Sequence, residues 1–217
     1  MFKVYFAGDL FDHKHITGNY VLARKIEELS DGLYQCMLPQ NWEGMLNTAI
    51  DIRNKDIQSV IQSDLVLFNF DGTDLDSGTV VEFMVAKMLD IPAVLLRTDV
   101  RNGGYIFGLD WNLMVEGFPR CTVVKYPALS MYNAVGLNEM HTTIARSVLD
   151  AFEKLRQQEP LLHTFEELNA AYQHVIKMCG SGMESFVSAQ HVQDLISAKI
   201  HKRVTKQVIQ DHQQPLL

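Results

Sequence analysis

Three acidic residues, Asp64, Asp76 and Glu82, surround one short segment in which an apolar run is followed by a polar turn and a helical pattern. The apolar run, Leu65–Phe70, is rich in branched and aromatic residues, which is typical of a buried strand. A carboxylate can serve as a nucleophile or as a general base. The types and spacing of these residues therefore make them candidates for nucleophilic or acid–base chemistry.

The residues that follow complete a strand–helix–strand unit. A turn rich in Gly and Asp spans 71–78, a helix is expected over 79–89, and Pro92 precedes a second apolar run, Ala93–Leu96. Strand, helix and strand within roughly 30 residues form a βαβ unit of a parallel sheet. The turn then lies at the carboxyl edge of the sheet, where open α/β sheets bind their ligands.

Glu82 is the residue of this unit that most needs an explanation. Its neighbours on the expected helix face are apolar: Val85, Ala86 and Leu89. Its carboxylate is therefore directed at the sheet. One interpretation is a capping box, in which Glu82 accepts a hydrogen bond from the Thr79 amide. The other is a nucleophile or base kept ionised by the helix dipole, and the two nearby aspartates favour it, because a cap does not need three carboxylates.

Composition limits the class of protein. With 217 residues, 47% of them hydrophobic and 21% charged, the chain suits one α/β domain with an appendage. Its apolar runs are shorter than the ~20 residues that span a bilayer, and the first residues are better explained as a strand than as a signal sequence. A net charge of −7 without a basic cluster argues against a nucleic-acid partner. We therefore expect a cytoplasmic protein that binds neither nucleic acid nor membrane.

Cysteine spacing and short motifs remove several enzyme classes. Cys36, Cys121 and Cys179 are far apart and form no CxxC pair, as expected of buried thiols in a reducing compartment. The sequence has no HExxH, GxxxxGK[ST] or GxGxxG motif. Zinc proteases, P-loop enzymes and ordinary dinucleotide-binding folds therefore lose their main sequence signals.

Strands alternate with helices over most of the chain. Strands are expected at 2–7, 33–38, 65–70, 93–96 and 121–124, and helices at 19–29, 49–62, 79–89 and 137–155. The long polar loop over 97–112 is typical of a lid or binding loop. Beyond 157 the pattern is helical only, at 164–178, 185–201 and a tail through 209.

These elements predict an α/β fold, a flavodoxin-like doubly wound five-stranded parallel sheet of order 2-1-3-4-5 with a C-terminal helical extension. The expected division is a catalytic domain at 1–157 and the extension at 158–217. In that order the first and third strands are neighbours at the switch point of the sheet. Tyr5, the turn at 8–11, Asp64 and the loop at 76–82 would then converge on one crevice, which predicts a ligand site there.

Four sequence blocks in this region resemble the nucleoside 2-deoxyribosyltransferase family. They are VYFAG at 4–8, IQSVIQSD at 57–64, DSGTVVE at 76–82 and NLM at 112–114. Their order and spacing are similar to those of the family over about residues 1–155, and the combination is more specific than any single block. The resemblance does not extend to the helical region after 157.

The resemblance implies transfer of a 2-deoxyribosyl group between nucleobases, with a deoxynucleoside and a free nucleobase as substrates and no metal or organic cofactor. Glu82 matches the family's nucleophile, which forms a covalent deoxyribosyl-enzyme, so that configuration is retained as in retaining glycosidases. Asp64 and Asp76 match residues that bind the substrate and handle the proton of the base. Neighbouring carboxylates in a partly dry pocket raise one another's pKa, which would leave one of them protonated near neutral pH.

The resemblance also implies roles for residues away from the carboxylates. Tyr5 matches a tyrosine that holds the nucleophile, and Asn112 matches a residue that enters the pocket of an adjacent subunit, which implies a homo-oligomer with composite sites. Gly8 belongs to the first block and is expected to border the substrate. Phe11 is placed to stack on a base and Gln40 to hydrogen-bond one, although a core phenylalanine and a turn glutamine are commoner roles.

Two other functions are compatible with the same residues. A hydrolase on this fold would cleave the N-glycosidic bond of deoxynucleosides or deoxynucleotides with water, although Asp9 in the first loop would repel a 5′-phosphate. A non-catalytic nucleoside-binding module would use Glu82 only as a cap. The helical extension is expected to serve in subunit packing or, alternatively, as a lid over a neighbouring pocket.

Overall fold

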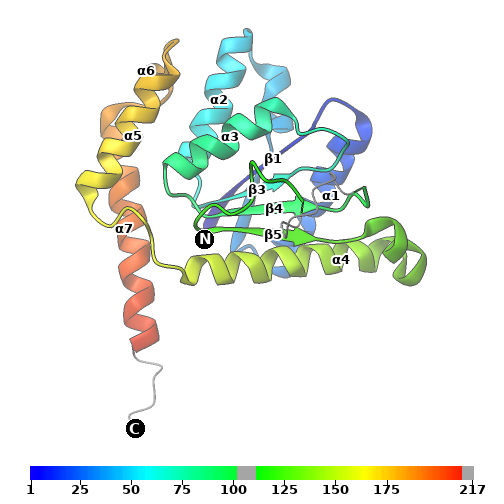
Figure 1. The fold of residues 1–217 in the computed structure, drawn as a ribbon. Coiled ribbons are helices and arrows are strands. Elements are labelled where there is room, and N and C mark those ends of the chain that lie inside the picture. The colour runs from blue at the N-terminus through cyan, green and yellow to red at the C-terminus, as the bar shows by residue number, and fades with distance from the viewer. Residues whose placement is uncertain (102–110, 212–217) are drawn as a thin grey trace. The chain divides into compact units, whose positions relative to one another are not determined.

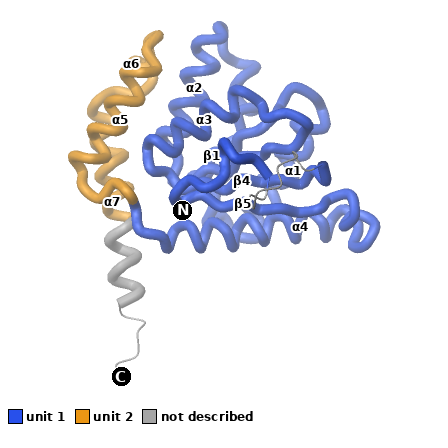
Figure 2. Tube along the Cα trace, in the orientation of Figure 1, with its two compact units in different colours: residues 1–160 blue, residues 161–217 orange. Residues whose placement is uncertain are grey.

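The computed structural model describes residues 1–101 and 111–211 (Figure 1). It divides into two compact units, residues 1–160 and 161–217, which Figure 2 shows in different colours. The first unit contains a five-stranded parallel sheet of order β2-β1-β3-β4-β5. Its strands are β1 (Phe2–Gly8), β2 (Tyr34–Met37), β3 (Leu65–Asn69), β4 (Ala93–Arg97) and β5 (Cys121–Lys125). This arrangement confirms the predicted flavodoxin-like fold and its strand order.

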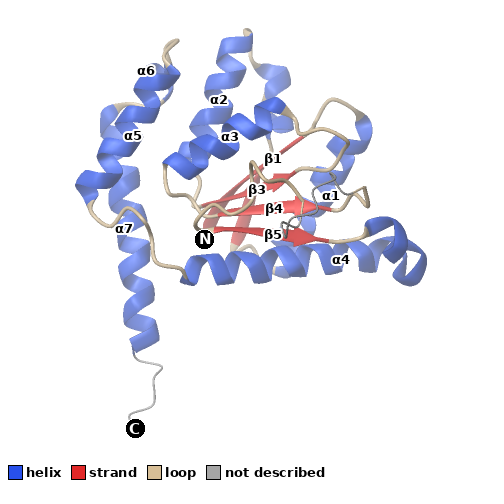
Figure 3. Ribbon diagram, viewed as in Figure 1, coloured by secondary structure: helices blue, strands red, loops and turns tan. Residues whose placement is uncertain are grey.

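The two faces of the sheet are covered by different pairs of helices (Figure 3). Successive strand residues point to opposite faces. Val4, Phe6 and Leu67 pack in one core with α1 (His13–Leu29) and α4 (Ala128–Gln157). Tyr5 and Phe68 point to the other face, which is covered by α2 (Ala49–Gln62) and α3 (Ser77–Met88). Two short 3-10 turns, η1 (Pro39–Asn41) and η2 (Glu43–Met45), precede α2.

Side-chain caps mark the beginnings of α1, α2 and α3, whereas α4 begins without one. Asp12 accepts hydrogen bonds from the backbone amides of Lys14 (2.8 Å) and His15 (3.1 Å), so α1 begins at His13 and not at the expected Asn19. α4 also begins earlier than expected, at Ala128. Gly136, with φ of 77°, breaks it into two segments, and the second corresponds to the helix expected over 137–155.

The second unit is helical. α5 (Phe165–Cys179) begins with a capping box formed by Thr164 and Glu167. The single helix expected over 185–201 is instead α6 (Met183–Phe186) and α7 (Ala189–Asp211), separated by the extended residue Val187. Apolar residues of these helices are buried: Leu168, Tyr172, Val175, Ile176, Met183, Val192 and Ile196. No helix among the residues that the structure describes has the length and apolar character to cross a membrane.

Candidate active site

A cavity of about 290 Å³ opens at the carboxyl edge of the sheet, beside the first turn of α3. This size is near the lower end of small-molecule sites. Three segments far apart in the sequence build it: the turn after β1, the η1–η2–α2 segment, and the start of α3. The lining residues are Gly8, Leu10, Phe11, Pro39, Glu43, Asp56, Asp76, Ser77, Gly78, Thr79 and Glu82.

Glu82 lies at the meeting point of the sheet and α3. The Tyr5 hydroxyl, on the inner strand β1, donates a hydrogen bond of 2.6 Å to Glu82 Oε1. The Tyr5 ring is fully buried and stacks against Trp42, with 6.4 Å between the ring centroids. A carboxylate on a helix is thereby held in position by a buried side chain of the sheet.

The capping-box interpretation of Glu82 is wrong. Asp76 is the N-cap of α3, and its Oδ2 accepts hydrogen bonds from the Thr79 amide (2.7 Å) and the Thr79 hydroxyl (2.8 Å). Because Asp76 already accepts the hydrogen bond of the Thr79 amide, Glu82 is not needed as the cap of this amide. Its carboxylate instead faces Tyr5 and the cavity.

Burial dominates the electrostatics of Glu82. Desolvation raises the pKa of Glu82 to about 8, against the lowering effect of the Tyr5 hydrogen bond, and the nearby Asp56 and Asp76 raise it further. Desolvation therefore opposes the ionised state that the helix dipole is expected to favour. Burial and the Glu82 carboxylate raise the pKa of Tyr5 well above its usual value, so the phenol keeps its proton and acts as a donor.

Asp56 and Glu43 are acidic residues of the cavity that the sequence did not reveal, and Asp56 is the more buried of the two. Its carboxylate is buried on α2, and Trp42 Nε1 donates a hydrogen bond of 2.9 Å to its Oδ1. Desolvation raises the pKa of Asp56 to about 7; the Trp42 hydrogen bond lowers it and Glu43 raises it. Asp56 lies one helical turn before the buried Val60, and this spacing was the available sequence signal.

Asp64 lies at the opposite edge of the sheet, and its expected place in the crevice is wrong. It immediately precedes β3, where its Oδ2 accepts a hydrogen bond of 2.9 Å from the Lys3 amide. Strands rise about 3.3 Å per residue, so β3 separates Asp64 from the carboxyl edge by roughly 16 Å. Asp56, from the helix that precedes β3, takes the position that we expected for Asp64.

The remaining predicted site residues divide into two groups. Gly8 and Phe11 line the cavity, and the Phe11 side chain is 78% exposed at its mouth. Gln40 does not line it, because its Nε2 donates a hydrogen bond of 3.0 Å to the Ile16 carbonyl. Asn112 also lies outside the lining, and its Oδ1 accepts from the Met114 amide at 2.9 Å. The lid expected at 97–112 falls largely on 102–110, which are outside the described residues.

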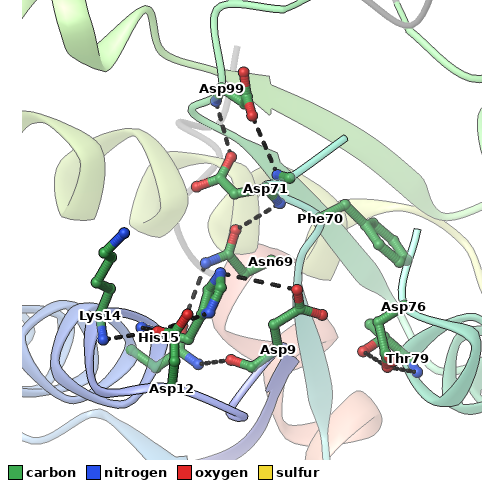
Figure 4. A network of polar contacts seen from close by, with 12 residues as sticks. Asp9, Asp12, Lys14, His15, Asn69, Phe70, Asp71, Asp76, Thr79 and Asp99 are labelled. Atoms are coloured by element: carbon green, nitrogen blue, oxygen red, sulfur yellow. Dashed lines mark hydrogen bonds and ion pairs between the residues drawn. The ribbon is translucent and has the colours of Figure 1, made fainter. Parts of the chain in front are cut away.

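Polar contacts hold the turns that border the cavity (Figure 4). Asn19 Nδ2 donates to the Asp9 carbonyl at 2.9 Å, and His15 Nε2 lies 3.8 Å from Asp9 Oδ2. In the turn after β3, Asp71 Oδ1 accepts from the Asp99 amide at 2.9 Å. Partial burial and the nearby Asp76 carboxylate raise the pKa of Asp9. In the described part of the chain no group of three or more His, Cys, Asp or Glu residues could hold a metal ion.

Replacing Gly8 with alanine is expected to destabilise the fold and disturb the cavity. Gly8 has a φ of +152°, and an added Cβ would lie 2.9 Å from the Asn69 carbonyl oxygen and 3.0 Å from Asn69 Cβ. We expect a loss of roughly 1–3 kcal/mol in the free energy of unfolding, as for a strained backbone position. Urea denaturation measures it. The control is Gly18→Ala in α1, where a Cβ meets nothing within 4 Å and alanine should stabilise by up to ~1 kcal/mol. Equal effects at both positions would contradict this reading of Gly8.

Comparison with known proteins gives a clear family match. A search of curated proteins found no match. Similar solved structures include a 2-desoxiribosyltransferase from Leishmania mexicana (21% identity over 63% of this chain and 100% of that chain, TM-score 0.47). They also include a conserved protein from Enterococcus faecalis V583 (26% identity, 72% and 98% coverage, TM-score 0.46). The model of the nucleoside 2-deoxyribosyltransferase family matches residues 4–118, more than half of the sequence. The chain therefore belongs to the nucleoside 2-deoxyribosyltransferase family.

Proposed function

We propose that this protein transfers a 2-deoxyribosyl group between nucleobases through a covalent intermediate on Glu82. Its family takes nucleosides and nucleobases as substrates. The observation that carries the proposal is the Glu82 carboxylate, which lines the cavity and accepts a 2.6 Å hydrogen bond from Tyr5. Burial raises the pKa of Glu82 to about 8, and the Tyr5 donor opposes that rise by favouring the ionised form, which is the form a nucleophile needs.

The first step breaks the bond between sugar and base. A Glu82 oxygen attacks the anomeric carbon, and the electrons of the carbon–nitrogen bond pass to the departing base. The base leaves readily only if it receives a proton, which we assign to Asp56, because burial raises the pKa of Asp56 to about 7. Asp76 is fixed by Thr79 at the cavity wall and is assigned to substrate binding.

The second step reverses the first with a new base. A nitrogen of the incoming base attacks the anomeric carbon, the bond to Glu82 breaks, and the carboxylate is regenerated. The proton that the incoming base loses returns to Asp56, so atoms and charges balance over the cycle. Each step inverts the anomeric carbon, and two inversions give net retention.

The direct test is base exchange. The purified protein is incubated with 2′-deoxyinosine or thymidine and a second free base, with the matching ribonucleoside as control. We expect a new deoxynucleoside only from the 2′-deoxy donor. Base release that proceeds equally without the second base would identify a hydrolase instead.

The charge of the cavity favours an unphosphorylated substrate. Its ionisable lining residues within the described chain are all acidic: Glu43, Asp56, Asp76 and Glu82. Asp9 adds a further carboxylate in the neighbouring turn. The start of α3 also lines the cavity, and helix amides favour an anion, but the four carboxylates and the lack of a lining cation among the described residues oppose a 5′-phosphate, so a deoxynucleotide hydrolase is the weaker candidate.

The N-cap of α3 weighs against the non-catalytic alternative for Glu82. The non-catalytic module required Glu82 to cap α3, but Asp76 provides that cap. Burying a carboxyl group without need is unfavourable, and the raised pKa of Glu82 records that cost. We therefore keep catalysis as the proposed role and treat binding without turnover as an outcome that the exchange assay would reveal.

Two further proposals concern the assembly. We propose that Asn112 contributes to the cavity of a neighbouring subunit in a homo-oligomer, because it does not line the cavity of its own chain. We propose that the helices after α4 pack subunits together or cover a neighbouring cavity. Truncation after residue 157, followed by sizing and an exchange assay, separates these two roles.

Replacing Trp42 with phenylalanine is expected to shift the pH dependence. Burial raises the pKa of Glu82 to about 8 and that of Asp56 to about 7, so the two carboxyl groups together hold one proton near neutral pH. We therefore expect kcat/KM to peak between pH about 7 and 8. Phenylalanine keeps a ring beside Tyr5 but removes the indole N–H that lowers the pKa of Asp56. Asp56 then holds its proton to higher pH, and the alkaline limb moves upward.

The control for this variant is Trp111→Phe. Trp111 stacks near Phe70 and Arg97 and does not line the cavity, so its loss should leave the alkaline limb in place. An alkaline limb that is unchanged or lower in the Trp42 variant would remove Asp56 from the role of proton donor.

A further inference from the structure

Glu43 is the carboxylate of the cavity whose role the reaction leaves unassigned. It belongs to the short η2 turn, next to Trp42, and it lines the cavity with Pro39 and Asp56. It is close enough to raise the pKa of both Asp56 and Glu82. The exchange reaction needs a nucleophile, a proton donor and a sugar-binding group, and other residues already supply these.

The hydrogen-bonding state of Glu43 differs from that of the other three cavity carboxylates. Tyr5 donates to Glu82, Trp42 to Asp56, and Thr79 to Asp76. Among the residues that the structure describes, none donates a hydrogen bond to the Glu43 carboxylate. Partial burial and the Asp76 carboxylate raise the pKa of Glu43. A partly desolvated acceptor without a protein donor gains most from a donor that a ligand brings.

The surroundings of Glu43 suit the flat ring of a base. Leu10, Phe11 and Pro39 give the lining apolar surface, and the start of α3 contributes the hydroxyl-bearing residue Ser77. Apolar and aromatic groups pack against the faces of a base, and polar groups read its edge. Asp56, the proposed proton donor to the base, comes from the same η2–α2 segment as Glu43.

We infer that Glu43 selects the nucleobase by accepting hydrogen bonds from N–H groups on its Watson–Crick edge, and that guanine is the base it fits best. This inference rests on the proposed function. Guanine presents a ring N–H beside an exocyclic amine, and two adjacent donors match the two oxygens of a carboxylate. Cytosine presents one amine, which a glutamate can accept. Thymine places carbonyl oxygens on both sides of its single N–H, and these repel a carboxylate.

The test compares donors in the wild type and in Glu43→Gln. Values of kcat/KM are measured for 2′-deoxyguanosine, 2′-deoxycytidine and thymidine with one common acceptor base. The amide of glutamine can donate to a carbonyl, so the variant should lose rate with deoxyguanosine and keep or gain rate with thymidine. We expect the deoxyguanosine-to-thymidine ratio to fall at least ~10-fold, the lower range for a bidentate contact to a base. Glu159→Gln, which removes an exposed carboxylate outside the cavity, is the matched control and should leave the ratio unchanged.

A second measurement separates this inference from the proposed function. In a Glu82→Gln background, which should bind without turnover, calorimetry gives the dissociation constants of deoxyguanosine and thymidine with and without Glu43→Gln. If the wild type shows no base exchange but calorimetry shows a preference for deoxyguanosine that depends on Glu43, the proposed function is overturned and the role of Glu43 is supported. If the wild type is active and Glu43→Gln changes kcat/KM and the dissociation constant by the same factor for all donors, the role of Glu43 is overturned and the proposed function stands.

Discussion

Replacing Glu82 with glutamine is expected to lower kcat for base exchange by about 10⁴-fold or more, the scale seen when an enzyme loses its nucleophile. Glutamine keeps the shape of the side chain and can still accept the Tyr5 hydrogen bond, but its amide oxygen is a poor nucleophile. Steady-state rates at pH 7.5, with a donor and a free base, measure the effect. Residual rates within tenfold of the wild type would contradict the assignment.

Stability separates catalytic loss from structural loss in this variant. The pKa of Glu82 is raised by burial from 4.5 to about 8, so the protonated carboxyl favours the folded state. That contribution is fully present below pH 4.5 and is lost as pH rises through 8. Glutamine does not ionise, so the variant should be at least as stable as the wild type at pH 8. A lower free energy of unfolding at pH 8 would indicate a structural role.

Replacing Asp56 with asparagine is expected to lower kcat/KM by roughly 10²–10⁴-fold, the usual contribution of general acid–base catalysis. Asparagine can still accept the Trp42 N–H bond but has no acidic proton to give. The loss should depend on the leaving base. 5-Fluorouracil departs more easily without a proton, so the variant should lose less kcat/KM with the 2′-deoxynucleoside of 5-fluorouracil than with thymidine. Equal losses with both donors would argue against proton donation by Asp56.

Asp64→Asn provides the matched control, because it makes the same chemical change at the other edge of the sheet. Asp64 accepts from the Lys3 amide and is absent from the cavity lining. We expect its variant to keep the leaving-base dependence of the wild type, with any defect confined to stability. If the rate loss depended on the leaving base in Asp64→Asn and not in the Asp56 variant, Asp64 and not Asp56 would be the proton donor.

The sheet was predictable from the sequence because its strands are short apolar runs separated by turns and amphipathic helices. The patterns of β1 and β3 were clear, and the doubly wound order then placed Tyr5 near Asp76 and the first turns of α3, which carry Glu82. The start of α1 was missed because its first turns carry little apolar pattern, and the Asp12 cap determines it instead.

The acidic residues of the site were only partly predictable, for two physical reasons. Proximity in sequence suggested Asp64, but a strand carries its two ends to opposite edges of a sheet. Asp56 was not singled out because charged residues are usually exposed, although its helical spacing from Val60 indicated burial. The acceptor role of Glu43 depends on which donors its neighbours use, and only the folded structure supplies that information.

The covalent step is the central claim, and one measurement tests it most directly. The protein is incubated with a 2′-deoxynucleoside and no acceptor base, quenched with acid, and analysed as intact protein and as peptides by mass spectrometry. We predict a mass increase of one deoxyribosyl group, located on Glu82, which disappears when a free base is added before the quench. A preparation that exchanges bases at full rate, yet shows no adduct or carries it on another residue, would contradict the account.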